Sequence, residues 1–277
     1  MRHSWWLILC VLLGSGAQAQ WMHYPTPGTP RGRDGKANLS APPPRVNGKP
    51  DLSGLWQVEP TPFDEMSRLF GKGLDTLSVP GDDLHGFNKY TISVLADFKP
   101  EEAPLRPQAA EILKHRFANP GTNPTTHCQM AGLPFGGILP FANKFIQAPG
   151  VIVVMQEADG AVRQIFTDGR RHTADAEPTW MGYSVGKWDD DSLVVDTRGF
   201  NDKAWLDAAG HPRSEAMHLE ERYRRRDFGH MDVEVTFDDP KMYTKKFSIK
   251  YTLDLLPDSE IGEYVCAENE KDNAHIK

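Results

Sequence analysis

The sequence predicts a mainly β fold, an antiparallel barrel with an extended N-terminal arm and one or two short helices. Segments 231–237 and 247–255 alternate strictly between apolar and polar residues, which is typical of antiparallel strands with one face in water. Pro149-Gly150 and Asp159-Gly160 are turn signals between strand-like runs. Eight or nine such runs with short turns indicate a closed or nearly closed barrel, or a sandwich.

The N-terminus reads as an export signal. Arg2 precedes the apolar run 5–13, and Ala17-Gln18-Ala19 follows it as a cleavage site. The apolar run is shorter than the ~20 residues that span a bilayer. We therefore expect a signal peptide over 1–19 and a periplasmic or secreted protein with no membrane span after cleavage.

Residues 20–50 are rich in Pro, Gly and Asn and show no hydrophobic period, so they predict an extended, partly mobile arm. A single domain is expected over 51–277, starting with a strand that carries Leu55 and Trp56. The pattern predicts a short helix over 63–70 and a helical insertion near 103–118. Further strands are expected at 144–148, 151–157, 161–168, 183–188, 192–197, 216–226, 231–237, 246–255 and 261–266.

Cys128 and Cys266 are the only cysteines outside the signal segment. In an oxidising compartment they most simply form one disulfide, and two buried free thiols are the alternative. A bond across so long a loop stabilises the fold by ~4–5 kcal/mol in the chain-entropy model. Neither cysteine has a second one nearby, which argues against a zinc site.

The formal net charge of −7 excludes nucleic acid as a partner, because binding it depends on clustered positive charge. The basic cluster 222–226 is flanked by Glu220, Glu221 and Asp227, which indicates a strand with salt bridges.

Two resemblances follow from the motifs. A chain that begins GLW at 54–56 and continues as hairpins resembles lipocalins and fatty-acid-binding proteins at the level of the fold, which favours a barrel. A second set of motifs resembles a family of exported, uncharacterised β-rich proteins of environmental bacteria, which implies export but no activity. Its motifs are PDLSGLW at 50–56, DGRRH at 168–172, PTWMGYSVGKW at 178–188, DSLVVDTRGFND at 191–202 and ERYRR at 221–225.

The stretch 177–226 has the highest density of aromatic, acidic and basic side chains. Within it, alternation places Glu221 on the same face as Leu219 and Tyr223, so Glu221 should point into the barrel. A buried carboxylate is costly unless it is paired or protonated. Glu221 is therefore either a structural ion-pair partner or an acid or base with a raised pKa. Its candidate partners are Arg163, Arg170 and Arg171. A bulge would reverse the facing and place His218 inside.

Asp168-Gly169 predicts a hairpin turn, and His172 beyond it is either a general base or a solvated side chain. The polar loop 200–214 holds Trp205, Asp207 and His211. It is either a lid with an acid/base pair or an ordered surface loop pinned by Trp205.

A metal site through His172, His211, His218 and Glu221 matches no zinc spacing. Residues 182–186 have the letters of a G-x-S-x-G nucleophile elbow, but no helix follows them, so serine catalysis is rejected.

We therefore expect an exported enzyme with acid/base chemistry, of lyase, isomerase or hydrolase type and without an organic cofactor. Its substrate would be a small apolar or aromatic molecule. The alternatives are a lipocalin-like carrier of a small hydrophobic ligand and a structural envelope protein. A polar cavity with a His–carboxylate pair would favour the enzyme, a smooth apolar cavity the carrier, and a filled core the structural protein. The candidate catalytic residues are His172, Glu221, Asp207 and His211, and the candidate substrate contacts are Trp180, Tyr183, Trp205, Arg170, Asn201 and Tyr223.

Overall fold

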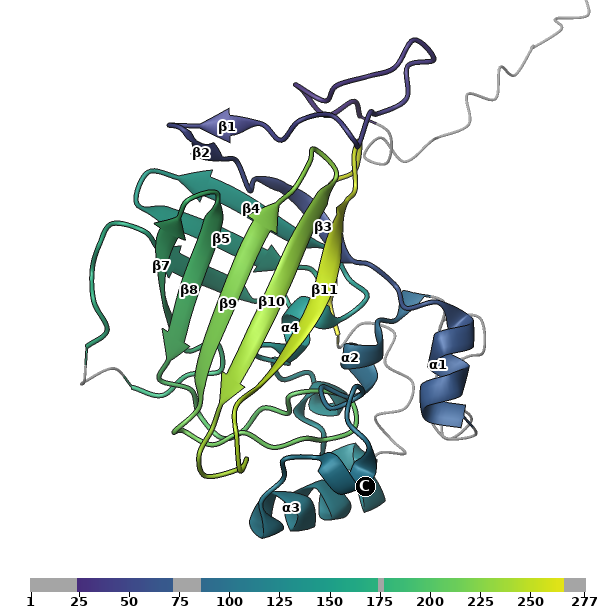
Figure 1. Ribbon diagram of the computed structural model, residues 1–277, viewed down its shortest axis with the longest axis vertical. Coiled ribbons are helices and arrows are strands. Elements are labelled where there is room, and N and C mark those ends of the chain that lie inside the picture. The colour runs from purple at the N-terminus through teal and green to yellow at the C-terminus, as the bar shows by residue number, and fades with distance from the viewer. Residues whose placement is uncertain (1–23, 72–85, 174–176, 267–277) are drawn as a thin grey trace, which may run out of the picture.

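The computed structural model describes residues 24–71, 86–173 and 177–266. The predicted signal peptide lies outside the described residues. Nine described strands close into a barrel in the order β10-β11-β3-β4-β5-β6-β7-β8-β9, and a two-stranded ribbon, β1-β2, stands apart from it (Figure 1). The strands are β1 (Arg45–Val46), β2 (Lys49–Pro50), β3 (Gly54–Val58), β4 (Asn143–Ala148), β5 (Val151–Gln156), β6 (Val162–Phe166), β7 (Tyr183–Asp189), β8 (Ser192–Arg198), β9 (His218–Arg225), β10 (His230–Asp238) and β11 (Phe247–Leu255).

The barrel confirms the predicted fold class, with two corrections. β6 and β7 pair in parallel, with Ile165 opposite Ser184. The connection between these two strands is therefore a crossover and not the hairpin that an all-antiparallel barrel would have. The strand predicted at 261–266 does not form. β11 already pairs with β3, so the closed barrel leaves no free edge beside it.

Buried and more exposed residues alternate along the barrel strands, as predicted. Along β10, Met231, Val233, Val235 and Phe237 are buried, and the residues between them are less so. β9 pairs with β10 without a bulge, so Val235 lies opposite Glu221. Glu221 therefore points inward, and the reversed facing that would place His218 inside is excluded.

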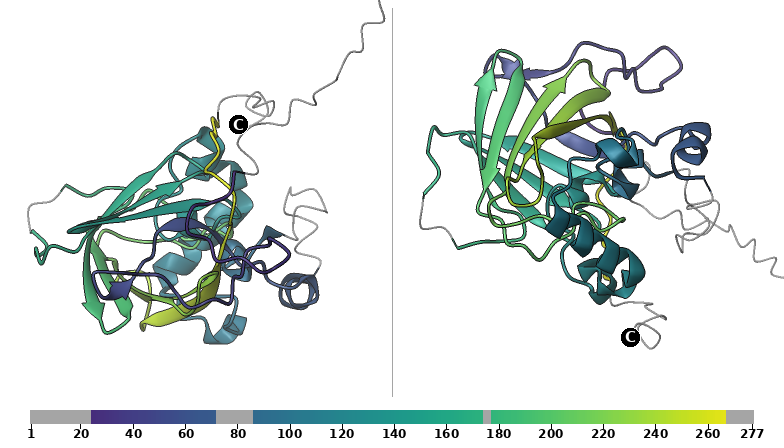
Figure 2. Two further views of the ribbon diagram at one scale, coloured as in Figure 1. Left: turned by 90° about the horizontal axis from the view of Figure 1, so that it is seen from above. Right: turned by 60° about the horizontal axis from the view of Figure 1, so that its bottom comes forward.

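Short helices lie beside one end of the barrel, the lower end in Figure 1, and the right-hand view of Figure 2 brings that end forward. Pro107 opens α3, where its missing N–H costs nothing, as the sequence predicts. Within the described residues no helix is long and apolar enough to cross a bilayer. The helices are α1 (Phe63–Phe70), α2 (Lys89–Ile92), α3 (Pro107–Ala118) and α4 (Phe135–Ile138), with 3-10 turns at Pro100–Glu102, Pro120–Thr122 and Pro124–His127.

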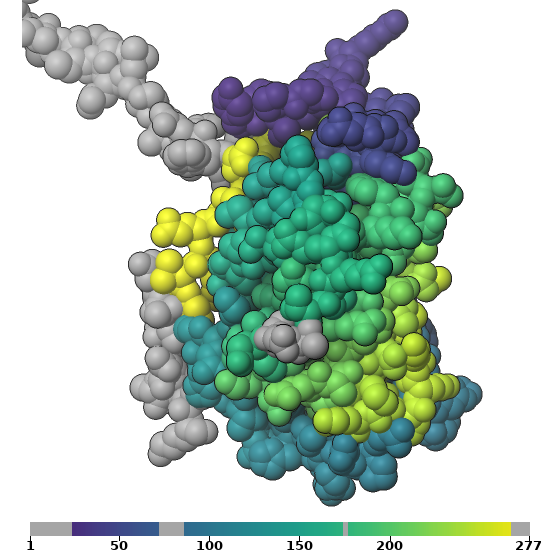
Figure 3. Space-filling model, turned by 90° about the vertical axis from the view of Figure 1, so that its left-hand side faces the viewer, coloured from purple at the N-terminus to yellow at the C-terminus, as the bar shows by residue number. Residues whose placement is uncertain are grey.

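The arm is tied to the barrel along its described part. Arg45 donates to Asp191 at 2.7 and 2.9 Å in the β7–β8 turn. The backbone N–H of Gly229, in the β9–β10 turn, donates to the Leu39 carbonyl at 2.7 Å. Figure 3 shows the arm, in purple, at the top of the molecule. The arm therefore lies over the barrel end opposite the helices, where the sequence predicted a partly mobile segment.

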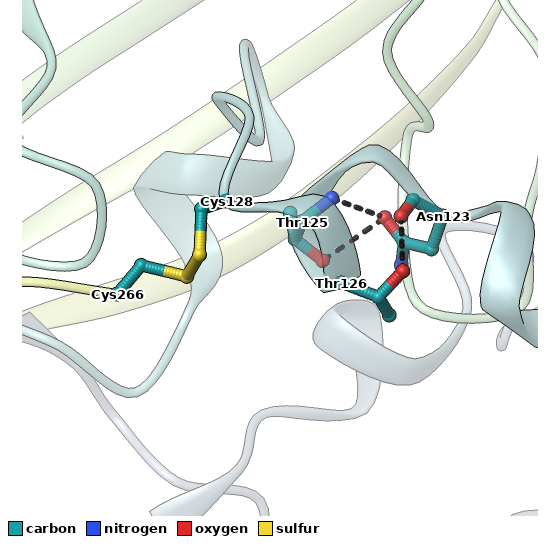
Figure 4. Close-up of a disulfide and its surroundings, with 5 residues drawn as sticks. All are labelled: Asn123, Thr125, Thr126, Cys128 and Cys266. Atoms are coloured by element: carbon teal, nitrogen blue, oxygen red, sulfur yellow. Dashed lines mark hydrogen bonds between the residues drawn. A yellow bond between two sulfur atoms is a disulfide. The ribbon is translucent and has the colours of Figure 1, made fainter. Parts of the chain in front are cut away.

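Cys128 and Cys266 form the predicted disulfide, with their Cα atoms 5.5 Å apart. The bond joins the loop after α3 to the segment that follows β11 (Figure 4). It links residues 138 positions apart, which removes much of the freedom of the unfolded chain.

Candidate functional site

Most of the candidate residues lie in three separate places. Glu221 and Tyr223 lie inside the barrel, and Asp207, His211 and Trp205 lie together in the loop between β8 and β9. His172, Tyr183 and Arg170 meet on the outer wall, as the contacts below describe. The candidate catalytic residues therefore do not come together in one site.

Inside the barrel, Glu221 forms an ion pair with Arg163 of β6, one of its three predicted partners. Both Arg163 terminal nitrogens bond the carboxylate, Nη1 at 3.0 Å. The Tyr223 hydroxyl donates to Glu221 Oε1 at 2.6 Å. Arg163 Nε donates to Ser184 at 3.0 Å and Nη2 to Thr197 at 3.0 Å. Arg163 Nη1 also donates to the Tyr223 hydroxyl at 3.4 Å. All five N–H donors of the guanidinium are therefore used.

This network resembles a structural ion pair more than a poised acid or base. Burial works to lower the pKa of Arg163, but Glu221 and Tyr223 raise it overall, so the guanidinium stays charged. Burial and the Glu221 carboxylate raise the pKa of the Tyr223 hydroxyl well above its usual value. The interior is therefore polar but fully paired around Glu221.

The space left in the barrel is small. A cavity of about 20 Å³ lies beside Arg163, Glu221 and Tyr223, which is room for about one water molecule. Asn143 Oδ1 and Gln156 Oε1 line it and have no hydrogen-bond partner among the described residues. A bridging water suits this polar gap, whereas an organic substrate or a carried ligand does not fit.

On the outer wall, His172 and His218 share Asp196 of β8. Their Nε2 atoms lie 2.8 Å from Oδ1 and 3.0 Å from Oδ2 of that carboxylate, but neither contact has the in-line geometry of a hydrogen bond. Arg198 Nε also donates to Asp196, at 3.0 Å. Partial burial works to raise the pKa of Asp196, but His218 and Arg198 lower it overall. The Tyr183 ring contacts His172 edge-on at 5.8 Å.

Arg170 belongs to the same wall. Its guanidinium lies 3.7 Å above the Phe166 ring, bonds Asp168, and donates to the Tyr183 hydroxyl at 3.3 Å. The chain bends at Asp168-Gly169, where Gly169 has a φ of 85°, but the predicted hairpin turn does not form, because β6 and β7 pair in parallel. These contacts satisfy Arg170 and Tyr183 on the surface of the barrel wall.

The loop before β9 is buried, which corrects the alternative of a surface loop. The Leu206 N–H donates to the His211 carbonyl at 2.9 Å, and Trp205 pairs with Pro212. Gly210 turns the chain with a φ of 98°, where a side chain would clash with Arg116 and Trp205. The turn brings Asp207 and His211, four residues apart, face to face.

Asp207 and His211 form a buried dyad. His211 Nδ1 lies 2.6 Å from Asp207 Oδ2, and the two residues are 5% and 0% exposed. Oδ2 also accepts the Val94 N–H, and Oδ1 accepts those of Gly210 and His211, at 2.7 to 3.1 Å. Because the carboxylate can only accept, His211 Nδ1 donates to it, and in the neutral imidazole Nε2 then carries the lone pair. Nε2 has no hydrogen-bond partner among the described residues.

Arg116 of α3, which the sequence analysis did not single out as a functional residue, lies beside this dyad. Its guanidinium stacks 5.1 Å from the Trp205 ring, and Nη1 donates to the Gly210 carbonyl at 3.3 Å. Among the described residues it forms no ion pair with a carboxylate. Burial lowers the pKa of Arg116, although Tyr243 and Asp207 oppose this.

Asn201 and Trp180 have structural contacts through Arg213, another residue that sequence reasoning missed. Arg213 is 1% exposed and donates to the carbonyls of Asn201, Leu133 and Trp180 at 2.6 to 2.9 Å. It also donates to Asn201 Oδ1 at 3.2 Å. Burial lowers the pKa of Arg213 to about 9. This arginine therefore joins three loops at the lower end of the barrel.

No group of three or more His, Cys, Asp or Glu side chains within the described ranges is arranged to hold a metal ion. The four residues considered as a metal set are dispersed: His172 and His218 lie outside the barrel wall, Glu221 lies within it, and His211 belongs to the buried loop. Comparison with protein-family models, curated proteins and solved structures found no match to this chain.

Proposed function

We propose that the protein is an exported enzyme that performs acid/base chemistry on a small, largely apolar or aromatic organic molecule. His211 is its general base, and Asp207 positions it. The observation that carries the proposal is the dyad, in which a buried carboxylate holds Nδ1 and Nε2 has no hydrogen-bond partner in the described part of the chain. Export is supported by the signal-like segment 1–19.

The other candidate places are less suited to proton transfer. Glu221 is fully paired beside a cavity of about 20 Å³. His172 turns its Nε2 toward Asp196 on the outer wall of the barrel, away from the barrel interior. The size of the barrel cavity also argues against a carrier that holds its ligand inside the barrel.

The dyad supplies the parts that a general base needs. His211 Nε2 takes a proton from the substrate, and the Asp207 carboxylate stabilises the imidazolium that results. The four hydrogen bonds to Asp207 fix its position, so the imidazole does not need to reorient. Arg116, without a carboxylate partner among the described residues, stabilises the negative charge that develops on the substrate.

Reactivity of His211 tests the proposal. We expect diethyl pyrocarbonate to modify His211 in the folded protein, because its Nε2 lone pair is free. Peptide mass spectrometry measures the modification, with the exposed His115 of α3 as an internal reference. We also expect the protein to hydrolyse 4-nitrophenyl acetate, with His211→Gln lowering the rate by ~10²–10⁴-fold.

His115→Gln is the matched control and should leave the rate unchanged. If His115 reacts with diethyl pyrocarbonate while His211 stays unmodified, the base is not reachable and the proposal is wrong. A His211→Gln variant that hydrolyses the ester at the full rate would also contradict it.

A further inference from the structure

A second candidate site lies outside the barrel, at the disulfide. A pocket of about 460 Å³ opens between the loop before α4, the β5–β6 turn and the segment before Cys266. Sites for small organic molecules commonly have volumes of ~300–1,000 Å³. This disulfide pocket is therefore large enough for such a ligand, whereas the cavity in the barrel is not.

The lining of the disulfide pocket is largely apolar. Leu139, Phe141, Tyr264 and Val265 supply its large hydrophobic surfaces. The Phe141 and Tyr264 rings lie 5.5 Å apart at a tilt of 57°, and Tyr264 remains 44% exposed. Two aromatic rings on one pocket provide faces and edges against which a further ring can pack.

The polar groups of this pocket do not favour a charged ligand. Among the described lining residues Asp159 alone is charged, and both of its oxygens accept backbone N–H groups, from Ala131 at 2.8 Å and Ala161 at 3.1 Å. The Thr125 hydroxyl donates to Asn123 Oδ1 at 3.0 Å (Figure 4). No Lys or Arg of the residues that the structure describes lines the pocket to bind an anion.

The outer wall of the pocket is fixed at several points. Lys144 Nζ donates to Glu260 at 2.8 Å, and the Gly262 N–H donates to Glu157 at 3.1 Å. The Cys128–Cys266 bond then fastens the end of this segment beside Tyr264 and Val265. Both cysteines are themselves lining residues, so the disulfide forms part of the site.

From these observations we propose that the disulfide pocket binds a neutral small molecule with at least one aromatic ring. This site is independent of the Asp207–His211 dyad, because none of its lining residues belongs to the dyad or contacts it. Phe141 and Tyr264 hold the ring, and the disulfide keeps the Tyr264 side of the pocket in place.

Fluorescence titration with N-phenyl-1-naphthylamine tests the site. We expect saturable binding of one neutral probe per chain. Its sulfonated analogue, 8-anilinonaphthalene-1-sulfonate, should bind more weakly, because a pocket with one carboxylate and no cation disfavours an anion. Tyr264→Ala should weaken binding of the neutral probe by up to about tenfold, through loss of an aromatic contact. Tyr24→Ala, which removes another exposed tyrosine, is the control and should change nothing.

A Cys128→Ser/Cys266→Ser double variant that remains folded by circular dichroism should bind the neutral probe more weakly than the parent. If this variant unfolds, Tyr264→Ala decides the outcome alone, since that residue is 44% exposed and its loss opens no space in the core. Absent binding, equal affinity for the two probes, or an unchanged affinity in Tyr264→Ala would each overturn the proposal.

Discussion

Glu221 is the buried carboxylate on which the barrel interior depends. It is 2% exposed and accepts hydrogen bonds from Arg163 and Tyr223. An ion pair of this kind adds little net stability compared with apolar residues of the same shape, but removing one partner leaves the other charge buried and uncompensated. The interior should therefore tolerate loss of the whole pair better than loss of one member.

Glu221→Gln should lower the free energy of unfolding by ~3–5 kcal/mol, because it leaves the Arg163 guanidinium without its counter-charge. Glu220→Gln, the next residue on β9 and exposed, should change it by ~0–1 kcal/mol. Urea unfolding of both variants at neutral pH provides the measurement. If Glu221→Gln leaves the free energy of unfolding unchanged while Glu220→Gln lowers it, then Glu220 and not Glu221 points into the barrel.

The inward direction of Glu221 followed from period-two alternation, because that pattern is local and the strand has no bulge. The pairing of Asp207 with His211 was also within reach, since the two residues are only four positions apart in the sequence. The roles of Arg116 and Arg213 were not predictable. Their partners are mainly backbone carbonyls of loops remote in sequence, and no pattern in the side chains records such contacts.

At the scale of single elements, β8 and β9 hold a charged cluster on their outer faces. Asp196 of β8 faces His218 of β9, and His172 reaches the same carboxylate from the β6–β7 connection. This cluster fastens the long parallel crossover to the wall. The contact of His172 with Asp196 and His218 could not be predicted from the sequence, because the β6–β7 connection has no regular hydrophobic period that would place His172.

The stability of an Asp196→Asn variant, measured against pH, tests whether the Asp196 carboxylate anchors the β6–β7 connection. The folded state lowers the pKa of Asp196, so the stabilisation is present above the unfolded value of ~4 and is lost as the pH falls below it. We expect the variant to be ~1 kcal/mol less stable than the parent at pH 7 and to approach the parent's stability below pH ~4. Thermal unfolding between pH 7 and 3 measures this.

Glu111→Gln, at an exposed position on α3, serves as the control and should follow the parent at every pH. If Asp196→Asn falls below the parent by the same amount at pH 7 and pH 3, then Asp196 does not anchor the crossover by its charge.

At the scale of the whole molecule, the barrel is a scaffold with a filled interior rather than a container. The described arm lies at one end, while helices and the buried loop before β9 lie at the other (Figure 1). The sequence predicted the barrel because alternation reports which face of a strand is buried. The size of the space inside the barrel could not be predicted from the sequence. It depends on contacts between side chains of strands that are distant in sequence, such as the Arg163–Glu221 ion pair.

The central claim is that small molecules are bound outside the barrel. A crystal structure of the protein grown with saturating N-phenyl-1-naphthylamine tests it most directly. We predict density for the probe in the disulfide pocket between Phe141 and Tyr264, and no more than ordered water beside Glu221. Probe density inside the barrel, with the Arg163–Glu221 pair displaced, would contradict the account.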